Sequence, residues 1–517
     1  MASLPTWLKD AIFYEIYPQS FLDTDSDGIG NLQGIIRKLD YIRELGCNAL
    51  WLNPCFASPF ADAGYDVADY CRIAPRYGSN DDARELFEQA HRRGMHVILD
   101  LVPGHTSMEH PWFRESLKRE KNEFTHRYVW TDSVWEAPQV GNISGWLRGI
   151  SSRDGACAVN FFSAQPALNY GFCEPTESWQ LPMDHPAALA TGKAMEDVVR
   201  FWLDLGCDGF RVDMASSLIK NDPEHKGIVA FWQRFFASVC PDYPQAAFVS
   251  EWGDPYYSLQ AGFHMDFLLH FGPSHYLDLF REKPYFAQNG GGDVSRFVET
   301  YRMNMEKTNG LGLMCLPSGN HDMVRLAHTL TDGERRLAFA FLLSMPGAPF
   351  LYYGDEIGMR YLPEVESVEG GYFRTGSRSP MQWDGSVTAG FSAAPPDTYY
   401  IPLDPDPARP NVRDAMADKD SLWWEIHRLI DLRRAHSALG VEGGIEFLYA
   451  EKEKAPFVYL RSSPEERILV AINPTAEETS VNLPLENGTP LYAVGGQAIL
   501  AGGRLTVPAG SASFLSL

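Results

Sequence analysis

Charged residues interrupt a strand-like apolar run at Gly209-Phe210-Arg211-Val212-Asp213-Met214. Arg211 and Asp213 are two residues apart, so in an extended chain both side chains point to the same face. A buried carboxylate is costly unless it is paired, and an arginine beside it holds it ionised, which is the state that a nucleophile requires. The pattern also fits a structural ion pair at a strand end. The rest of the chain must decide between the two interpretations.

Acids and histidines also close other apolar runs of the chain. Asp100 ends one run and His105 follows it, Glu251 ends another, and His321 and Asp322 follow a third. Carboxyl groups that are crowded together repel each other, and this repulsion raises at least one pKa. A glycosidase works with such a pair, one ionised and one protonated, as nucleophile and general acid/base.

These runs belong to a regular alternation of strands and helices. Helices are predicted at 32–45, between the cap residue Asn31 and Gly46, and at 80–93, 193–205 and 421–436. Strands are predicted at 13–21, 49–54, 96–102, 209–214, 247–252, 264–270, 313–317 and 348–353. The pattern predicts the α/β class and a closed (β/α)8 TIM barrel, in which the polar strand ends meet on one face. No G-x-G-x-x-G follows the first strand, which argues against a dinucleotide fold.

Three regions are predicted from where this alternation stops. Residues 1–102 and 172–436 form the catalytic barrel, and 103–171, rich in Trp, Phe, Gly and Ser, form an irregular subdomain inserted after the third strand. Residues 437–517 contain short alternating runs such as 457–460 and 468–471, broken by Gly and Pro, which are typical of a small antiparallel β domain.

The amino-acid composition limits the kinds of partner that the protein can bind. The formal net charge of -23 argues against nucleic acid and against an anionic membrane surface, and favours a small neutral substrate. The 13 Trp, 23 Tyr and 30 Phe suit a carbohydrate site, since sugar rings stack on aromatic faces. The eight Cys include no C-x-x-C pair, and no apolar run is long enough to span a membrane. We therefore expect reduced thiols and a cytoplasmic protein; oligomeric state is not indicated.

The polar strand ends and several nearby segments resemble the motifs of glycoside hydrolase family 13, the α-amylase family. The main motifs are 100–105 (DLVPGH), 209–213 (GFRVD), 249–252 (VSEW) and 320–322 (NHD). Supporting matches are 64–66 (GYD), 165–169 (QPALN) and 378–384 (RSPMQWD). The resemblance covers essentially the whole chain and is strongest to the branch of oligo-1,6-glucosidases, α-glucosidases and trehalose synthases.

The resemblance implies roles for individual residues. Asp213 would attack the anomeric carbon, Glu251 would act as general acid/base, and Asp322 would stabilise the oxocarbenium-like transition state. Retention of configuration follows if the Asp213 and Glu251 carboxyls lie about 5–5.5 Å apart. The residues expected to bind substrate or to orient the nucleophile are Tyr65, Asp66, His105, Arg211, His321 and Arg325.

The same resemblance bears on metals. Family members usually carry Asn where this chain has Gly104 and commonly Asp where it has Ala167, so a calcium site beside the insertion is not expected. Residues 23–31 (DTDSDGIGN) place oxygen ligands at every second position, like half of an EF-hand loop. The predicted ligands of a structural Ca²⁺ or Mg²⁺ are Asp23, Asp25, Asp27, Ile29 and Asn31. The alternative is an acidic turn with a helix cap. No cofactor is expected for catalysis.

The long segments after the third and eighth strands should wall the site into a pocket, which admits only a chain end. We therefore predict a retaining exo-acting α-glucosidase on short oligosaccharides, with α-1,4 and α-1,6 bonds both open because Met214 differs from the Val of α-1,6-selective relatives. A trehalose synthase or another glucosyl transferase is the alternative, loosely favoured by Tyr400–Pro405. A non-catalytic sugar-binding relative is a third hypothesis, weakened by the presence of all three acids.

Overall fold

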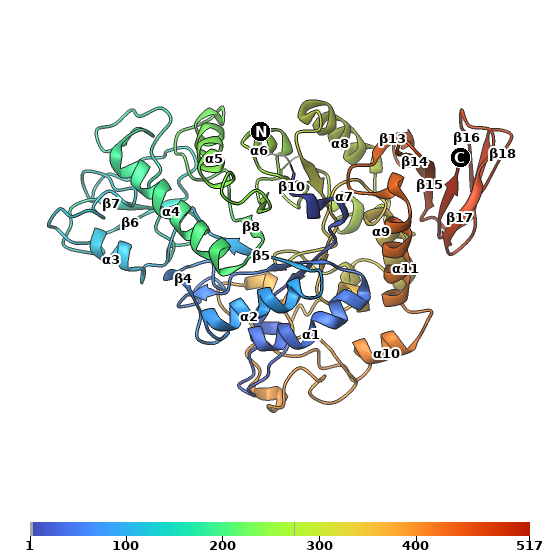
Figure 1. Cartoon of the computed structure of the whole chain (residues 1–517), viewed down its shortest axis with the longest axis horizontal. Helices are drawn as coiled ribbons and strands as arrows, with labels where there is room; N and C mark the ends of the chain where they lie inside the picture. The colour runs from blue at the N-terminus through green and yellow to red at the C-terminus, as the bar shows by residue number, and fades with distance from the viewer. Residues whose placement is uncertain (1–3, 273) are drawn as a thin grey trace.

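The centre of the molecule is a barrel of parallel strands (Figure 1). The computed structural model describes residues 4–272 and 274–517. Eight strands follow each other in the order β11-β10-β9-β8-β5-β2-β1-β12, and a parallel bridge between Pro317 and Phe350 joins the two outer strands. Their bounds are β1 Phe13–Ile16, β2 Ala49–Leu52, β5 His96–Leu101, β8 Gly209–Val212, β9 Ala247–Ser250, β10 Met265–Phe267, β11 Leu313–Cys315 and β12 Phe350–Tyr352. The predicted TIM barrel is confirmed.

Helices pack around this sheet. Those of the barrel are α1 Leu32–Leu45, α2 Asn80–His91, α4 Pro186–Leu205, α5 Lys226–Val239, α6 Pro255–Gln260, α7 Leu277–Phe280, α8 Val294–Thr308, α9 Asp332–Leu342 and α11 Leu422–Ala435, with the short α10 Val412–Ala417 before the last. The predicted ends of α1 are correct: the Asn31 side chain accepts a 2.9 Å hydrogen bond from the Gly34 N–H, and Gly46 adopts φ +110°.

The strands end earlier than predicted. β1 stops at Ile16 rather than at residue 21, because Pro18 lacks an N–H for the ladder and begins a 3-10 turn. β8 stops at Val212 and β9 at Ser250, so that Asp213 and Glu251 are the first residues beyond their strands. The acids therefore lie at the rim of the barrel, where a ligand can reach them.

Helix α4 begins at Pro186, well before the predicted start at residue 193. The prediction relied on apolar residues in the last turns, whereas the first turns carry mostly alanines with weak periodicity. His185 as N-cap and a proline at the first helical position were the local signals of this start.

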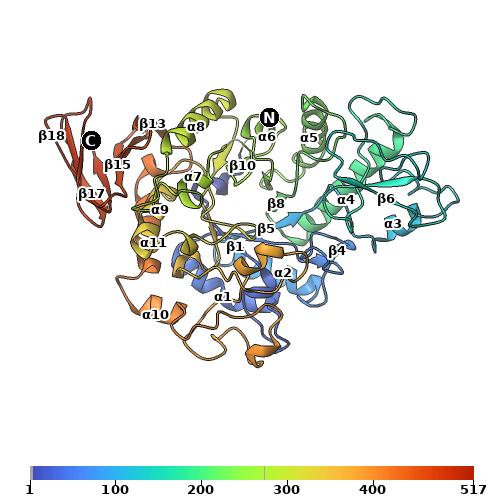
Figure 2. The same cartoon turned by 180° about the vertical axis from the view of Figure 1, so that it is seen from behind.

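Two smaller regions flank the barrel at opposite ends of the molecule (Figures 1 and 2). The irregular chain between β5 and α4 contains α3 Pro111–Ser116 and the antiparallel pair β6 Gly145–Arg148 and β7 Ala156–Val159. After β2, the short pair β3 Phe56–Ala57 and β4 Asp69–Ile73 begins and ends a loop that also reaches the rim of the barrel.

The C-terminal region consists of two antiparallel sheets, in the orders β13-β14-β15-β20-β17 and β16-β19-β18. Their bounds are β13 Gly444–Tyr449, β14 Phe457–Ser462, β15 Arg467–Asn473, β16 Thr479–Asn482, β17 Thr489–Val494, β18 Ile499–Ala501, β19 Arg504–Val507 and β20 Ser511–Ser516. A small apolar core, including Leu469 and Leu515 from one sheet and Leu500 and Leu505 from the other, packs between them. The predicted antiparallel C-terminal domain is confirmed.

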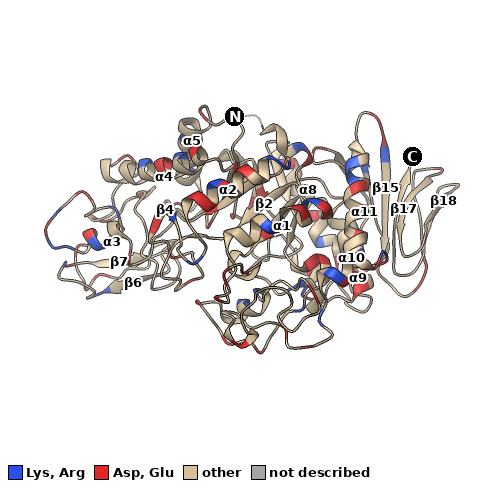
Figure 3. Cartoon of the chain, turned by 60° about the horizontal axis from the view of Figure 1, so that its bottom comes forward, with Lys and Arg blue, Asp and Glu red and all other residues tan. Residues whose placement is uncertain are grey.

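Acidic and basic residues are interspersed along the outer helices (Figure 3). Acids outnumber bases, 67 to 44, so the excess negative charge is spread over an otherwise mixed surface. Among the described residues, no helix combines the length and the apolar character needed to cross a bilayer.

Gly209 of β8 packs closely against the backbone of Ala247 in the neighbouring strand β9. A Cβ at this position would lie 1.9 Å from the Ala247 carbonyl oxygen, and φ is +144°. We expect Gly209→Ala to destabilise the fold by about 3 kcal/mol or more, from combined overpacking and backbone strain. Thermal unfolding followed by circular dichroism measures the change. Gly333→Ala in α9, where a Cβ meets nothing within 4 Å, is the matched control and should leave the melting temperature unchanged or slightly higher.

Candidate active site

A cavity of about 480 Å³ opens at the carboxyl ends of the barrel strands. Asp213, Glu251 and Asp322 all line it, although they lie far apart in sequence. Its other polar lining residues include Asp62, Tyr65, His105, Gln165 and Arg374, and its aromatic residues include Phe161, Phe162, Phe271, Tyr372 and Phe373. The volume lies in the range of small-molecule sites, and the mixture of apolar wall and few polar groups is typical of them.

The backbone places the first two acids accurately. The N–H of Asp213 donates to the Leu101 carbonyl at 2.8 Å, and the N–H of Glu251 donates to the Val212 carbonyl at 2.9 Å. Both residues thus remain attached to the neighbouring strand while their side chains face the cavity. Met214, directly after the first acid, has φ +41°, and its N–H donates to Glu251 Oε2 at 3.0 Å.

One guanidinium, that of Arg211, holds three carboxylates. Its Nη1 lies 2.8 Å from Asp100 Oδ1 and 3.0 Å from Asp213 Oδ1, and its Nη2 lies 2.5 Å from Glu251 Oε1. The Arg211 side chain is only 1% exposed. The predicted pairing of Arg211 with Asp213 is present, but the arginine is shared with two further acids.

One positive charge cannot balance three negative charges in a buried place. Burial raises the pKa of Asp100 to about 6, although Arg211 opposes the shift. Burial and then the charge of Glu251 raise the pKa of Asp213 well above its usual value. The cluster therefore retains at least one proton near neutral pH, shared within a coupled group of carboxyls. A retaining glycosidase needs such a mobile proton between its two acids.

Asp322 lies in the opposite electrostatic environment. Its Oδ1 accepts hydrogen bonds from Arg374 Nη1 at 3.0 Å and Arg378 Nη2 at 2.9 Å. Burial alone would raise its pKa, but the guanidinium charges of Arg378 and Arg374 hold the pKa of Asp322 well below its usual range. Asp322 is therefore a permanent negative charge beside the two acids that share a proton.

A buried polar layer lies under the cavity and orients Tyr65, which lines it. The Tyr65 hydroxyl lies 2.6 Å from His321 Nε2 and donates to Asp100 Oδ2 at 3.2 Å. On the other side of the imidazole, His321 Nδ1 lies 2.9 Å from Glu15 Oε1. Burial holds the pKa of His321 well below its usual value and raises that of Glu15. The layer thus consists of largely neutral groups joined by hydrogen bonds.

Four of the residues expected to bind substrate or to orient the nucleophile do not line the cavity. His321 and Arg211 belong to the layer beneath it: His321 contacts Tyr65 and Asp322, and Arg211 contacts the acids. Asp66 is fully buried and accepts hydrogen bonds from the Ala61 and Asp62 N–H groups, which shapes the loop. Arg325, 1% exposed, donates to the Tyr353 carbonyl and to Asp355. Motif position located these side chains near the site but did not show which layer they occupy.

His105 lines the cavity, as predicted, but both of its ring nitrogens already have protein partners. Nε2 lies 3.0 Å from the Tyr65 carbonyl oxygen, and Nδ1 lies 3.2 Å from Asn160 Nδ2. Burial lowers the pKa of His105 to about 3, so the ring is neutral. Nε2 therefore donates to the carbonyl and Nδ1 accepts from the amide.

The cavity wall contains two charged residues that the sequence analysis did not identify. Arg374 Nη2 lies 3.4 Å from Asp62 Oδ1, so this arginine bridges Asp62 and Asp322 across the cavity. Gln165 donates to the other oxygen of Asp62 at 2.7 Å. Asp62 lies four residues before Asp66, and Arg374 lies four residues before Arg378. This proximity to recognised motif positions was the available signal in the sequence.

Gly104 has a steric explanation in the structure. A Cβ there would lie 2.5 Å from Asn160 Nδ2. Asn160 Oδ1 accepts a hydrogen bond from the fully buried ammonium of Lys220 at 3.0 Å, and the Ser217 carbonyl accepts a second one at 2.6 Å. Burial lowers the pKa of Lys220 to about 7.

The 23–31 loop gathers carboxylates away from the cavity. One oxygen each from Asp23, Asp25 and Asp27 lies within 4.8 Å of the others. Burial, followed by Asp23 and Asp27, raises the pKa of Asp25, a strain that a bound cation would relieve. This all-oxygen set fits Ca²⁺ or Mg²⁺. Asn31 caps α1 through its Oδ1 and donates from its Nδ2 to Asp25 at 3.1 Å, contacts that belong to an acidic turn with a helix cap.

Comparisons with known proteins agree with this geometry. Residues 15–442 match the alpha amylase catalytic domain, and residues 445–513 match the maltogenic amylase C-terminal domain. The chain is 32% identical over 498 residues to a trehalose synthase/amylase of Mycolicibacterium smegmatis, covering 85% of this chain and 78% of that protein. It is 30% identical over 556 residues to an oligo-1,6-glucosidase of Parageobacillus thermoglucosidasius, covering 92% of each.

The fold is also that of a solved α-glucosyl transfer enzyme, XgtA, with a TM-score of 0.83 and 27% identity over 99% of this chain and 100% of that one. A (β/α)8 barrel with carboxylates around one cavity at its carboxyl end is the architecture of many glycoside hydrolases. The chain belongs to the α-amylase family, glycoside hydrolase family 13, and the predicted resemblance is confirmed.

Burial raises the pKa of Asp62 to about 6, against the opposing charge of Arg374. As the pH falls through 6, Asp62 becomes protonated and its ion pair with Arg374 weakens. We expect kcat/KM to fall between pH 7 and pH 5 for this reason. Asp62→Asn should lower kcat/KM about tenfold at pH 7, the loss of one charged hydrogen bond, and should flatten this acid limb. An acid limb of unchanged steepness in the variant would contradict this role of Asp62.

Proposed function

We propose that the chain is a retaining, exo-acting α-glucosidase that releases glucose from the non-reducing ends of short α-linked oligosaccharides. The observation that carries this proposal is the gathering of Asp213, Glu251 and Asp322 in one cavity above a fully buried layer. Family membership makes the substrate a sugar, whereas the chain-end mode, the bond cleaved and the residue roles belong to the proposal.

The chemistry follows from the electrostatics of the cavity. Glu251 passes a proton of the acid cluster to the glycosidic oxygen as the C1–O bond breaks. Asp213 then supplies an electron pair to C1 and forms a covalent glucosyl ester, and Asp322, always ionised, stabilises the positive charge that develops on the ring. In the second half, Glu251 takes a proton from water, the water oxygen bonds to C1 and the ester bond to Asp213 breaks, which restores both acids and releases glucose with retained configuration.

Chain-end specificity is supported by the Arg374 bridge. The arginine links Asp62, in the loop after β2, to Asp322, in the loop after β11. An ion pair across the wall closes one side of the cavity, so a polymer cannot pass straight through the site. The bridge also places three hydrogen-bonding side chains where the terminal sugar would lie. Both α-1,4 and α-1,6 bonds remain within the proposal.

Glucosyl transfer is the second candidate, and the aromatic mouth of the cavity favours it. Phe161, Phe271, Tyr372 and Phe373 line the cavity and are between 37% and 64% exposed. Exposed aromatic faces beyond the acids offer a stacking surface for a second sugar, which would compete with water for the covalent intermediate. Relatives named for trehalose synthesis and α-glucosyl transfer are consistent with this outcome.

Two further expectations are part of the proposal. The 23–31 loop would hold a structural Ca²⁺ or Mg²⁺ through Asp23, Asp25, Asp27, the Ile29 carbonyl and Asn31, remote from the chemistry. The eight cysteines all carry free thiols, which suits a reducing compartment and supports a cytoplasmic location.

A product screen tests the function. Purified protein is incubated with maltose, isomaltose, sucrose, trehalose and a short maltodextrin, and early products are followed by proton NMR. We expect α-glucose to appear before mutarotation and Asp213→Asn to lower kcat about 10⁴-fold, as removal of a nucleophile does. β-Glucose as the first product, or undiminished turnover by the variant, would contradict the mechanism. Trehalose or another new disaccharide in excess of free glucose would identify the transferase instead.

Chelation tests the proposed metal. We expect EDTA to lower the melting temperature by about 2–4 °C, because the cation binds only the folded loop, with kcat unchanged below the transition. Added Ca²⁺ should restore the melting temperature. Asp27→Asn should melt at the lower temperature with or without EDTA. A wild-type melting curve that is indifferent to both EDTA and Ca²⁺ would show that the loop is an acidic turn.

A further inference from the structure

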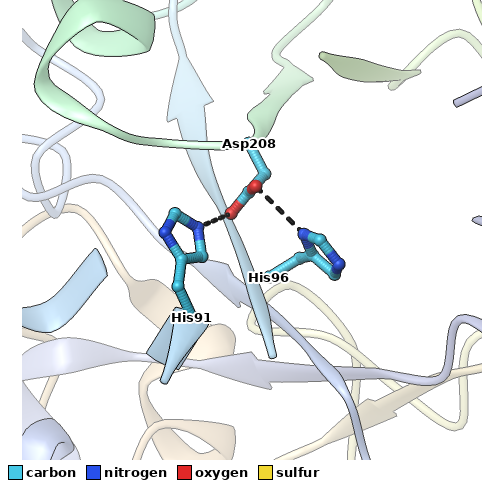
Figure 4. A group of neighbouring side chains, drawn as sticks. All are labelled: His91, His96 and Asp208. Atoms are coloured by element: carbon cyan, nitrogen blue, oxygen red, sulfur yellow. Dashed lines mark hydrogen bonds and ion pairs between the residues drawn. The ribbon is translucent and has the colours of Figure 1, made fainter. Parts of the chain in front are cut away.

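Two histidines and an aspartate meet at the end of the barrel opposite the cavity (Figure 4). His91 is the last residue of α2, His96 is the first residue of β5, and Asp208 directly precedes β8. All three therefore lie at the amino-terminal ends of neighbouring strands or in the turn leading to them. In a TIM barrel this face serves stability rather than chemistry, so the cluster is separate from the glycosidase site.

Both imidazoles point at the same carboxylate. His91 Nε2 lies 2.8 Å from Asp208 Oδ2, and His96 Nδ1 lies 3.0 Å from Asp208 Oδ1 (Figure 4). One donor atom from each residue falls within 4.8 Å of the other two. Two imidazole nitrogens and one carboxylate oxygen are the ligands that proteins use for zinc and its neighbours in the periodic table.

Two of the three ligands are held in place without the third. Asp208 Oδ2 also accepts the Val97 N–H at 2.8 Å, and the Asp208 N–H donates to the Val97 carbonyl at 2.8 Å. The His96 ring stacks on Trp7 with 4.3 Å between centroids. The His91 side chain is 41% exposed, so it is the member that can adjust and through which a cation can enter from solvent.

We propose that His91, His96 and Asp208 form a binding site for a nitrogen-preferring divalent cation of the zinc class. In tetrahedral zinc sites with bonds of about 2.0–2.2 Å, ligand atoms lie about 3.3 Å apart. The two nitrogen–oxygen contacts, 2.8 and 3.0 Å to different oxygens of Asp208, are close to that separation, so a modest adjustment of the side chains would let the carboxylate and both imidazoles bind one cation. Each imidazole then carries its proton on its other ring nitrogen, and water fills the remaining position.

The donor set separates this site from the acidic 23–31 loop. That loop offers only oxygen atoms, which suit Ca²⁺ and Mg²⁺, whereas imidazole ligands select transition metals. A cation at the His91 site would tie the end of α2 to β5 and β8. It should therefore stabilise the folded chain and leave the chemistry at the far face unchanged.

Zinc binding to the full-length protein tests the proposal. Metal-free protein is titrated with Zn²⁺ by calorimetry in excess Ca²⁺, which occupies the acidic loop, and thermal unfolding is recorded with and without Zn²⁺. We expect one tight zinc per chain, a melting temperature raised by about 2–4 °C, and unchanged kcat. His91→Gln, which can still donate to Asp208, should weaken zinc binding at least tenfold and abolish the thermal shift.

His436→Gln is the matched control, because His436 pairs with a single carboxylate, Glu466, at 2.8 Å. This variant should bind zinc as the wild type does. Equal zinc affinity in wild type and His91→Gln would overturn the proposal, and so would the absence of zinc binding by the wild type. Because glycosidase activity is measured separately, a failure here leaves the proposed function intact, and the reverse also holds.

Discussion

The structure depends most on the contact between the Arg211 guanidinium and the carboxylates of Asp100, Asp213 and Glu251. This contact is created by strand register. Arg211 of β8 lies opposite Asp100 of β5 on one side and opposite Val249 of β9 on the other. A shift of one residue would turn the arginine away from the barrel axis and leave buried carboxylates without a counter-charge. Closure of the barrel therefore also assembles the cluster of Arg211 and its three carboxylates.

Because the cluster holds more acids than bases, its chemistry follows from its electrostatics. Asp213 shares the single arginine Arg211 with Asp100 and Glu251, and the three carboxyls share a proton. Asp322 has two arginines beside it, Arg374 and Arg378, and stays ionised. Environment thus divides similar side chains into distinct roles, which is the general route by which one site provides both acid and base. The neutral layer of Tyr65, His321 and Glu15 beneath them adds orientation without adding charge.

The sequence predicted the barrel because eight apolar runs separated by helices admit few other folds. It predicted the acids because polar residues at the ends of buried strands require an explanation. The predicted strands were too long. Pro18, for example, ends β1 because it lacks an N–H, and apolar periodicity does not reveal this. The depth of Arg325 and Asp66 was also missed, because a motif fixes a position along the chain but not which side chains stand between it and the cavity. Arg374 forms ion pairs from its own loop to Asp62 and Asp322 in two other loops. No local sequence pattern predicts such a contact.

In the proposed mechanism the choice between hydrolysis and transfer does not depend on the charge cluster, because both reactions would use the same covalent intermediate and the same acids. What differs is the molecule that attacks it. Water is small, abundant and hard to exclude, so a transferase must raise the occupancy of a sugar at the mouth of the cavity. Stacking on aromatic residues such as Phe271 and Tyr372 does this, since it adds affinity for a sugar ring and none for water. Related proteins with one shared fold can therefore diverge in product through the rim alone, while the floor that Arg211 organises stays the same.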